Sequence, residues 1–402
     1  MKSKFYFLVL CLIGTACSVK KNLDGQTQKI KLLPSPSKST SAEPFLFTDI
    51  DSTVYLSWIE KSEGKASLKF SNLDNGQWSE PTVIASGNTW FVNWADYPMI
   101  AINGKQFVAH FLDKSGASTY AYDIKLTTSS DHGRTWLDPL ILHDDKKQAE
   151  HGFVTLLPYG DKFFVTWLDG RNTVMEGMKE MDHHAGHHGA MSLRAASIDA
   201  NGTKINEWEL DTKTCDCCQT SAAITTNGPV VVYRDRSDAE IRDMSIVRLL
   251  DGQWTEPKTI HNDNWKIAGC PVNGPRVVAE GNNLAVAWFS AASDTSHLNV
   301  IFSTDGGATF EKPIRIDEGN AIGRVDIVMI DEQSVMVSWM EGTVIKAAKV
   351  HRNGTKGPSM IIASSSESRS SGFPQMTKSG NQLIFAWTDD TEKNIKVASI
   401  SL

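Results

Sequence analysis

The chain has 402 residues, of which 41% are hydrophobic and 22% charged, and its formal net charge is −7. This acidic balance argues against a nucleic-acid partner, because nucleic-acid-binding domains present a basic surface. Beyond the N-terminal leader, no apolar run approaches the roughly 20 residues that cross a bilayer. The sequence therefore predicts no membrane-spanning helix in the mature protein.

The N-terminus has the pattern of an export signal. Lys2 and Lys4 precede a short apolar run, residues 5–13, and the small residues 14–16 follow it. A cut before Cys17 resembles the processing of bacterial lipoproteins, in which that cysteine is lipidated. An ordinary signal peptide cut nearby is the alternative.

This pattern predicts a chain in three parts. Residues 1–16 form the signal peptide, residues 17–43 form the lipidated cysteine and a polar tether, and residues 44–402 form the folded domain. The predicted location is the bacterial cell envelope, facing the periplasm or the cell surface. The membrane is contacted through the lipid anchor alone, and the protein is expected to be a monomer.

Seven similar segments with alternating apolar residues follow one another along the folded domain. Their central aromatic residues are Trp58, Phe111, Trp167, Tyr233, Trp288, Trp339 and Trp387. Further short strands and Gly-, Asn- or Asp-containing turns flank each segment, which is typical of the four-stranded blades of a β-propeller. The sequence predicts an all-β propeller with seven blades, six being the alternative. Residues 29–35 are predicted to supply the outer strand of the last blade and close the ring.

Two turns share a motif. Residues 129–136 read SSDHGRTW and residues 303–310 read STDGGATF, so both fit S-x-D-x-G-x-T-[WF]. In each, Asp131 or Asp305 can accept backbone N–H groups within a tight turn. The motif resembles the Asp box, or BNR repeat, of the sialidase (neuraminidase) superfamily over roughly residues 44–402. The resemblance implies a sialidase-like propeller with its ligand site on the rim opposite these turns.

Five arginines fall in loops of that opposite rim: Arg171, Arg234, Arg236, Arg276 and Arg324. Guanidinium groups suit carboxylates and other anions, so an anionic glycan or another anionic small ligand is the predicted partner. The resemblance implies an arginine triad, for which Arg234, Arg276 and Arg324 are the candidates. The alternative is that each arginine pairs with a nearby acid.

The resemblance also implies an acid/base aspartate and a tyrosine nucleophile activated by a glutamate. Asp96 is the candidate acid/base by its loop position, and Tyr233 with Glu240 is the candidate pair. The chain lacks a tyrosine after Tyr233 and the first-blade Arg-Ile-Pro motif of sialidases. An exo-glycosidase and a non-catalytic binding propeller therefore both stay open.

A longer insertion follows residue 171 and is rich in metal-ligating side chains: His183, His184, His187, His188 and Met191. Imidazole and thioether groups suit copper, and imidazole suits zinc. The sequence thus predicts a metal-binding or metal-dependent protein as its second functional alternative. A solvated loop without a bound ion is the competing interpretation.

Three of the chain's six cysteines stand in one tetrapeptide, as Cys215, Cys217 and Cys218, and Cys270 follows in a later rim loop. Four thiolates could hold a soft metal ion. In an oxidising compartment they could instead form disulfides, including one that joins Cys270 to Cys217 or Cys218. The sequence demands no cofactor; copper or zinc is the ion that these side chains suit.

Overall fold

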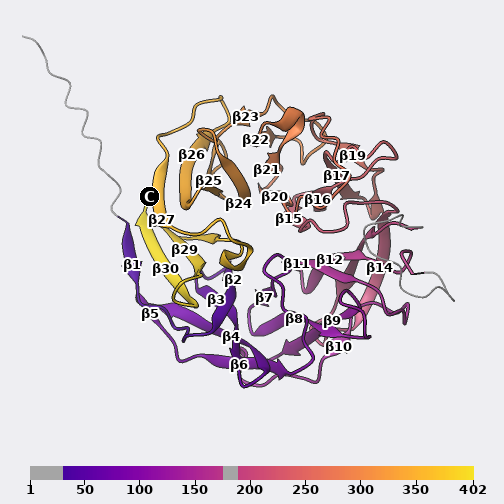
Figure 1. Cartoon of the computed structure of the whole chain (residues 1–402), viewed down its shortest axis with the longest axis vertical. Helices are drawn as coiled ribbons and strands as arrows, with labels where there is room; N and C mark the ends of the chain where they lie inside the picture. Colours follow the sequence, from indigo (N-terminus) through magenta and orange to yellow (C-terminus); the bar gives the residue numbers. More distant parts are fainter. Residues whose placement is uncertain (1–29, 175–188) are drawn as a thin grey trace, which may run out of the picture.

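The computed structural model describes residues 30–174 and 189–402. The predicted lipidation site Cys17 and the predicted histidine ligands at 183, 184, 187 and 188 lie outside the described residues. Figure 1 shows seven sheets arranged as a wheel around one axis, which confirms the all-β, seven-bladed, sialidase-like propeller. Among the described residues, helical turns occur only at Ala292–Asp294 and Arg369–Ser371.

The first four blades follow in chain order. Blade one contains β2 (Ser41–Thr48), β3 (Val54–Ser62), β4 (Lys65–Asp74), β5 (Gln77–Trp78) and β6 (Thr82–Gly87). Blade two contains β7 (Ile100–Asn103), β8 (Gln106–Lys114), β9 (Tyr122–Ser129) and β10 (Leu140–Ile141). Blade three contains β11 (His151–Tyr159), β12 (Lys162–Asp169), β13 (Ser192–Ile198) and β14 (Lys204–Asp211). Blade four contains β15 (Ser221–Thr225), β16 (Gly228–Arg234), β17 (Met244–Leu250), β18 (Gln253–Trp254) and β19 (Lys258–Thr259).

The remaining blades complete the circle. Blade five contains β20 (Arg276–Glu280), β21 (Asn283–Ser290), β22 (His297–Ser303) and β23 (Ile314–Arg315). Blade six contains β24 (Ala321–Asp331), β25 (Ser334–Glu341), β26 (Val344–His351) and β27 (Met360–Ser364). Blade seven contains β28 (Gln375–Ser379), β29 (Gln382–Asp389), β30 (Asn394–Ser401) and β1 (Lys31–Leu33).

Ring closure joins the two ends of the described chain. β1 pairs antiparallel with β30, with Lys31 opposite Ser399 and Leu33 opposite Val397. The indigo and yellow strands lie side by side in Figure 1. The predicted closing strand at residues 29–35 is thus observed, and it gives the last blade its fourth, outermost strand.

The core consists of apolar side chains packed between neighbouring sheets. The second strands of four blades each bury a tryptophan completely: Trp58, Trp167, Trp288 and Trp339. The Trp167 indole N–H donates to Asp169, and that of Trp339 donates to Glu341, each at 2.9 Å. In these two blades the acid two residues after the aromatic residue therefore satisfies a buried indole, as a buried polar group requires.

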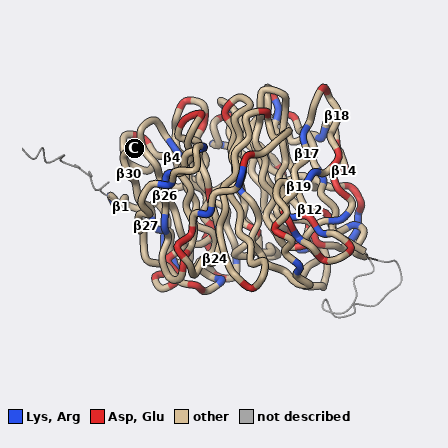
Figure 2. The backbone as a smooth tube through the Cα atoms, turned by 90° about the horizontal axis from the view of Figure 1, so that it is seen from above, with Lys and Arg blue, Asp and Glu red and all other residues tan. Residues whose placement is uncertain are grey.

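Both Asp-box turns join the third and fourth strands of their blades, as predicted. Asp131 Oδ1 accepts the backbone N–H of Thr135 at 2.9 Å, and Asp305 accepts that of Thr309 at 2.9 Å. Gly133 has a φ of 77°, in the left-handed region that glycine enters without steric cost. The edge-on view in Figure 2 shows the strands running between two rims. These turns lie on one rim, which leaves the other for the candidate site.

Among the described residues, no helix is both long and apolar enough to cross a membrane.

Candidate functional site

Side chains from distant blades meet on the rim opposite the Asp boxes. The Arg234 guanidinium donates to the carbonyl oxygen of Asn273, and Asn273 Oδ1 accepts the backbone N–H of Arg324 at 2.8 Å. The Arg324 guanidinium lies 5.0 Å from the ring centre of Trp94, in the loop that leads into blade two. Blades two, four, five and six therefore contribute to one assembly, as the wheel arrangement predicts.

Two of the predicted triad arginines are buried and bonded mainly to backbone carbonyls. Arg234 donates to Asn273, Arg242 and Phe289 carbonyls at 2.7–3.1 Å. Arg324 donates to Gly372 and Ser368 carbonyls at 2.9 and 3.0 Å, and also to the Ser371 hydroxyl. Their donors hold rim loops together, so substrate binding by these two arginines remains a prediction that this geometry does not favour.

Arg276 is the third predicted triad member and has a different environment. It is 9% exposed, its Nε lies 3.7 Å from Asp326 Oδ1, and its guanidinium lies 5.6 Å from the ring centre of Tyr97. Burial lowers the pKa of Arg276 despite the neighbouring carboxylate. Of the three, Arg276 is the one that lies beside a carboxylate and next to the loop that carries Asp96.

The remaining two arginines pair with acids. Arg171 binds Asp169 through two parallel hydrogen bonds of 2.8 Å, and Arg236 binds Glu240 and Asp216. Bidentate pairs of this kind leave few donors for a ligand. Arg171 and Arg236 therefore form ion pairs with nearby acids, which is the alternative that the sequence left open for them.

Tyr233 and Glu240, the predicted nucleophile pair, do not bond to each other. The buried Tyr233 hydroxyl donates to Asp211 Oδ2 at 2.5 Å, whereas Glu240 accepts from Arg236 and Arg242. Burial and the Asp211 carboxylate raise the pKa of Tyr233 far above its ordinary value. Glu240 was predicted as the partner of Tyr233, but the hydroxyl bonds to Asp211 instead. Asp211, at the end of β14, comes next to Tyr233 only in the folded chain.

Asp96 belongs to a buried acidic cluster that the sequence did not reveal. Its Oδ1 accepts the backbone N–H of Phe153 at 2.8 Å, and the nearby Tyr122 hydroxyl donates to Glu150 Oε1 at 2.8 Å. Desolvation raises the pKa of Asp96 to about 7 and that of Glu150 to about 8. An ideal Cβ on Gly152 would lie 2.0 Å from Asp96 Oδ2, so this close approach requires glycine.

A pocket opens beside this acidic cluster. Aromatic and apolar side chains form most of its wall, and Asp96 is its acidic member; the lining residues are Ile59, Trp90, Phe91, Val92, Asn93, Asp96, Pro98, Phe111 and Leu112. Its empty volume of about 220 Å³ lies below the roughly 300–1,000 Å³ of typical small-ligand sites, so it is a small cavity beside Asp96. Tyr122 and Glu150 were missed because neither occurs in a recognisable motif, although Glu150 lies in the loop leading into blade three.

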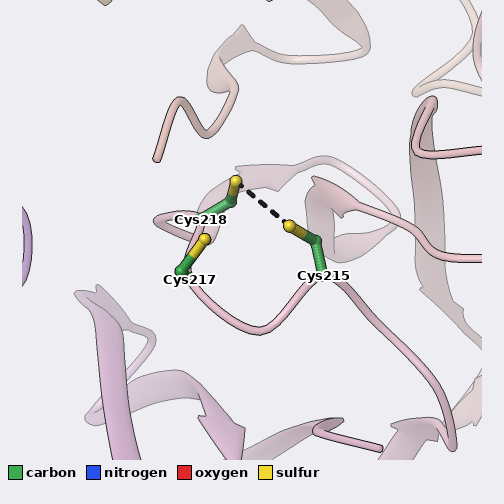
Figure 3. A group of neighbouring side chains, drawn as sticks. All are labelled: Cys215, Cys217 and Cys218. Atoms are coloured by element: carbon green, nitrogen blue, oxygen red, sulfur yellow. Dashed lines mark hydrogen bonds between the residues drawn. The ribbon is translucent and has the colours of Figure 1, made fainter. Parts of the chain in front are cut away.

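The thiol cluster has a compact geometry. Cys215 and Cys218 are buried, Cys217 is partly exposed, and Cys270 is exposed on the loop leading into blade five. The sulfur atoms of Cys215 and Cys218 lie 3.4 Å apart, and those of Cys215, Cys217 and Cys218 all lie within 4.8 Å of one another (Figure 3). The backbone N–H of Cys215 donates to the Arg234 carbonyl at 3.0 Å, which holds this loop against β16.

Positive charge surrounds Cys215. The Arg242 Nη1 atom donates to its sulfur at 3.3 Å. Burial opposes ionisation, but hydrogen bonds from Cys217 and Cys218 and the charges of Arg242 and Arg234 hold the pKa of Cys215 well below its ordinary value. Burial conversely raises the pKa of Cys218. The two guanidinium groups therefore favour the thiolate form of Cys215.

All four thiols are free in the structure, and the 3.4 Å separation exceeds a disulfide bond of about 2.05 Å. Met191, predicted as a further metal ligand, is buried in the core cluster between blades two and four. Its thioether packs against apolar side chains there. The cysteines thus lie together as predicted, whereas Met191 has a packing role.

No family model and no curated protein matches the chain. Among solved structures, a Hadza microbial sialidase aligns over 75% of this chain and 63% of its own, with 15% identity and a TM-score of 0.42. A puromycin-hydrolysing peptidase of Mycobacterium tuberculosis aligns over 89% and 53%, with 10% identity and a TM-score of 0.51. An α-L-arabinofuranosidase of Fusarium graminearum aligns over 92% and 96%, with 11% identity and a TM-score of 0.50.

The chain thus spans less than two thirds of the length of the first two of these proteins. The TM-scores of the peptidase and the arabinofuranosidase indicate a shared fold, and identities of 10 and 11% leave activity open, because one fold carries many functions. The peptidase and the arabinofuranosidase illustrate this, since their names give different reactions. The chain is a sialidase-like seven-bladed propeller in its fold.

Proposed function

We propose that this protein binds a soft metal ion, with Cu⁺ favoured over Zn²⁺, through Cys215, Cys217 and Cys218. The observation that carries the proposal is the spacing of the three sulfur atoms, all within 4.8 Å of one another. A tetrahedral site with metal–sulfur bonds of about 2.3 Å places its sulfurs about 3.8 Å apart. The cluster therefore needs small side-chain movements to enclose an ion, and Cys270 is the candidate fourth ligand.

The surrounding charges support thiolate ligation. Metal binding requires deprotonated cysteines, and Arg242 already favours the thiolate at Cys215. Thiolates select soft ions such as Cu⁺, whereas zinc accepts thiolate and imidazole alike. When bound, the ion would supply either a transferable cargo or a fixed cross-link between the loops that lead into blades four and five.

The experiment measures metal in untagged protein purified under reducing, anaerobic conditions. We expect about one Cu⁺ per chain, and at least a tenfold weaker affinity in Cys217→Ser. Met360→Leu, which removes a sulfur atom from β27 in blade six, serves as the control and should bind normally. The alternative is that the four cysteines form two disulfides, and thiol titration of the denatured chain tests it. Two disulfides, together with no metal uptake after gentle reduction, would refute the proposal.

The proposal places this metal site outside the cytoplasm, on a chain anchored by lipid at Cys17. The support is the N-terminal sequence pattern, with its basic start, apolar run and small residues before the cysteine. Mass spectrometry of the mature N-terminal peptide tests this directly. We expect a diacylated cysteine in the membrane fraction and its loss, with release of the protein, in Cys17→Ser.

Glycan hydrolysis is the second candidate function, and the acidic cluster favours it. Asp96, with a pKa of about 7, can be protonated near neutral pH and lines the pocket, as a general acid must. Arg276 lies over Tyr97, the residue after Asp96, and supports an anionic glycan as substrate. Turnover of a fluorogenic sialoside that is lost in Asp96→Asn but retained in the surface control Asp161→Asn would establish it. If both functions fail, a non-catalytic binding propeller is what the rim loops support.

A further inference from the structure

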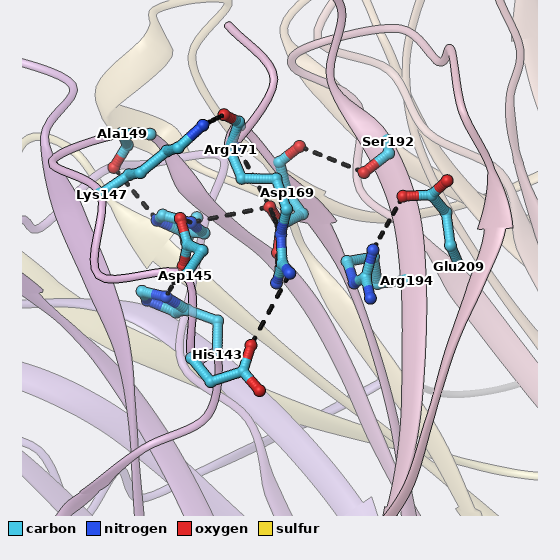
Figure 4. Close-up of polar contacts among 12 residues, drawn as sticks. His143, Asp145, Lys147, Ala149, Asp169, Arg171, Ser192, Arg194 and Glu209 are labelled. Carbon is cyan, nitrogen blue, oxygen red and sulfur yellow. Dashed lines mark hydrogen bonds and ion pairs between the residues drawn. The ribbon is translucent and has the colours of Figure 1, made fainter. Parts of the chain in front are cut away.

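A second group of ligand-type side chains lies outside the thiol cluster, between blades two and three. Figure 4 shows it at the end of β12 and in the loop leading into β11. Its members are two histidines and three aspartates: Asp123, His143, Asp145, His151 and Asp169. Both imidazoles are buried and stacked, with ring centres 3.6 Å apart and planes inclined by 4°.

The hydrogen bonds of His151 determine which nitrogen carries a hydrogen. Its Nδ1 lies 3.2 Å from the carbonyl oxygens of Tyr122 and Ala149, which can only accept, so Nδ1 bears a proton and donates. Its Nε2 faces two carboxylates, Asp145 Oδ2 at 3.2 Å and Asp169 Oδ1 at 3.7 Å. A lone pair on Nε2 would be repelled by these oxygens, so a proton or a metal cation must lie there.

His143 repeats the arrangement. Its Nδ1 lies 2.6 Å from Asp145 Oδ1, and its Nε2 lies 3.4 Å from Asp123 Oδ1. The side chain is 2% exposed, yet Nε2 has no hydrogen-bond partner of good geometry among the described residues. A buried, unpartnered ring nitrogen that faces a carboxylate is a donor atom suited to a cation.

The separations match the needs of a small divalent ion. With metal–ligand bonds of about 2.1 Å, tetrahedral nitrogen and oxygen ligands lie about 3.4 Å apart. His143 Nε2 and Asp123 Oδ1 lie 3.4 Å apart, and Asp145, 2.6 Å from the other ring nitrogen of His143, holds that imidazole in place. A backbone carbonyl bonded to the other ring nitrogen, as at His151, is the usual outer support of a metal-bound histidine.

The charge balance also favours a cation. Three carboxylates belong to the cluster, and the cations that face them are Arg171, bonded to Asp169, and Lys125, 3.9 Å from Asp123. Arg171 is further shared with Asp144 and Glu207. Asp169 already accepts two N–H groups of Arg171 on Oδ1, so its role is to orient the site rather than to ligate.

We propose that Asp123, His143 and His151, whose ligand atoms all lie within 4.8 Å of one another, bind one divalent cation of hard or borderline character, such as Mn²⁺ or Zn²⁺. The register shift in β11 between Gly152 and Thr155 positions His151 at the end of that strand. Such bulges re-aim side chains and are frequent beside functional sites. The site is chemically distinct from the thiol cluster, since nitrogen and carboxylate oxygen replace sulfur.

The test uses Mn²⁺, because this ion discriminates against thiolates, and a background chain in which His183, His184, His187 and His188 are changed to Asn. Isothermal titration and the electron paramagnetic resonance of free Mn²⁺ measure binding. We expect one Mn²⁺ per chain, with affinity reduced at least tenfold in His151→Gln. His297→Gln removes a partly exposed histidine of blade five and should leave binding unchanged.

Asp123→Asn is the second variant, because it keeps the shape of a partly exposed side chain if His151→Gln fails to fold. A rise in the melting temperature of the background chain with Mn²⁺ is a second measurement of binding that requires no site variant. Absence of binding and of that rise would show that protons alone occupy the cluster. Full binding in both variants would show that the ion does not bind there. Either result would overturn the proposal. The Cu⁺ titration of Cys217→Ser is independent of either result.

Discussion

The two rims of the wheel are stabilised in different ways. On the Asp-box rim, Asp305 bonds to the backbone and hydroxyl of Thr309, four residues away. On the opposite rim, Arg234 reaches the Phe289 carbonyl and Arg324 reaches that of Gly372, 55 and 48 residues away. Local bonds make the first rim readable as a motif. The bonds on the second rim join different blades, so they form only when the propeller has assembled and no sequence motif predicts them.

Arg234→Ala should produce the largest loss of stability. The substitution removes donors from the Asn273, Arg242 and Phe289 carbonyls at a buried position, where unsatisfied polar groups are costly. We expect the free energy of unfolding to fall by about 4 kcal/mol. Chemical denaturation measures it; an unchanged midpoint would mean that the rim does not depend on this arginine.

Glu150→Gln should remove a pH dependence from the same rim. Because burial raises the folded-state pKa of Glu150 from 4.5 to about 8, the folded chain holds a proton that the unfolded chain releases. The stability of the unsubstituted protein should therefore decrease as pH rises from about 4.5 to about 8, by a few kcal/mol. Glutamine can still accept from Tyr122, so the variant should be the more stable protein at pH 9.

Denaturation at several pH values measures this effect. Glu280→Gln, at the exposed end of strand β20 in blade five, is the matched control and should retain the slope of the unsubstituted protein. Parallel pH profiles for the unsubstituted protein and Glu150→Gln would contradict the assignment of a buried, protonated carboxyl.

Asp305→Ala should have the smallest effect of the three. It removes hydrogen bonds within one exposed turn, whose backbone groups water can reach, so we expect a loss of about 1 kcal/mol. Thermal denaturation measures the change. A loss as large as that of Arg234→Ala would show that the two rims do not differ as their bonding ranges suggest.

The sequence determined the fold because each blade repeats the same short-range pattern. Alternating apolar residues around Trp167 or Trp339, turn residues at fixed offsets and two Asp boxes all act over a few positions. Even the closing strand was visible, since residues 31–33 complete a blade that otherwise has three strands.

Only the tertiary structure decided which polar residues meet, because their partners lie tens of residues away. Tyr233 bonds to Asp211 rather than Glu240. Two of the arginines expected to bind an anion, Arg234 and Arg324, bond mainly to backbone carbonyls. The pairing of His143 with His151 and of Tyr122 with Glu150 follows no motif. The sequence shows that Cys215, Cys217 and Cys218 are close together, because they lie within one tetrapeptide. That Arg242 lies beside Cys215 is seen only in the folded structure. Short-range periodicity encodes the blades, whereas the chemistry of the rim depends on how the blades are packed around the axis.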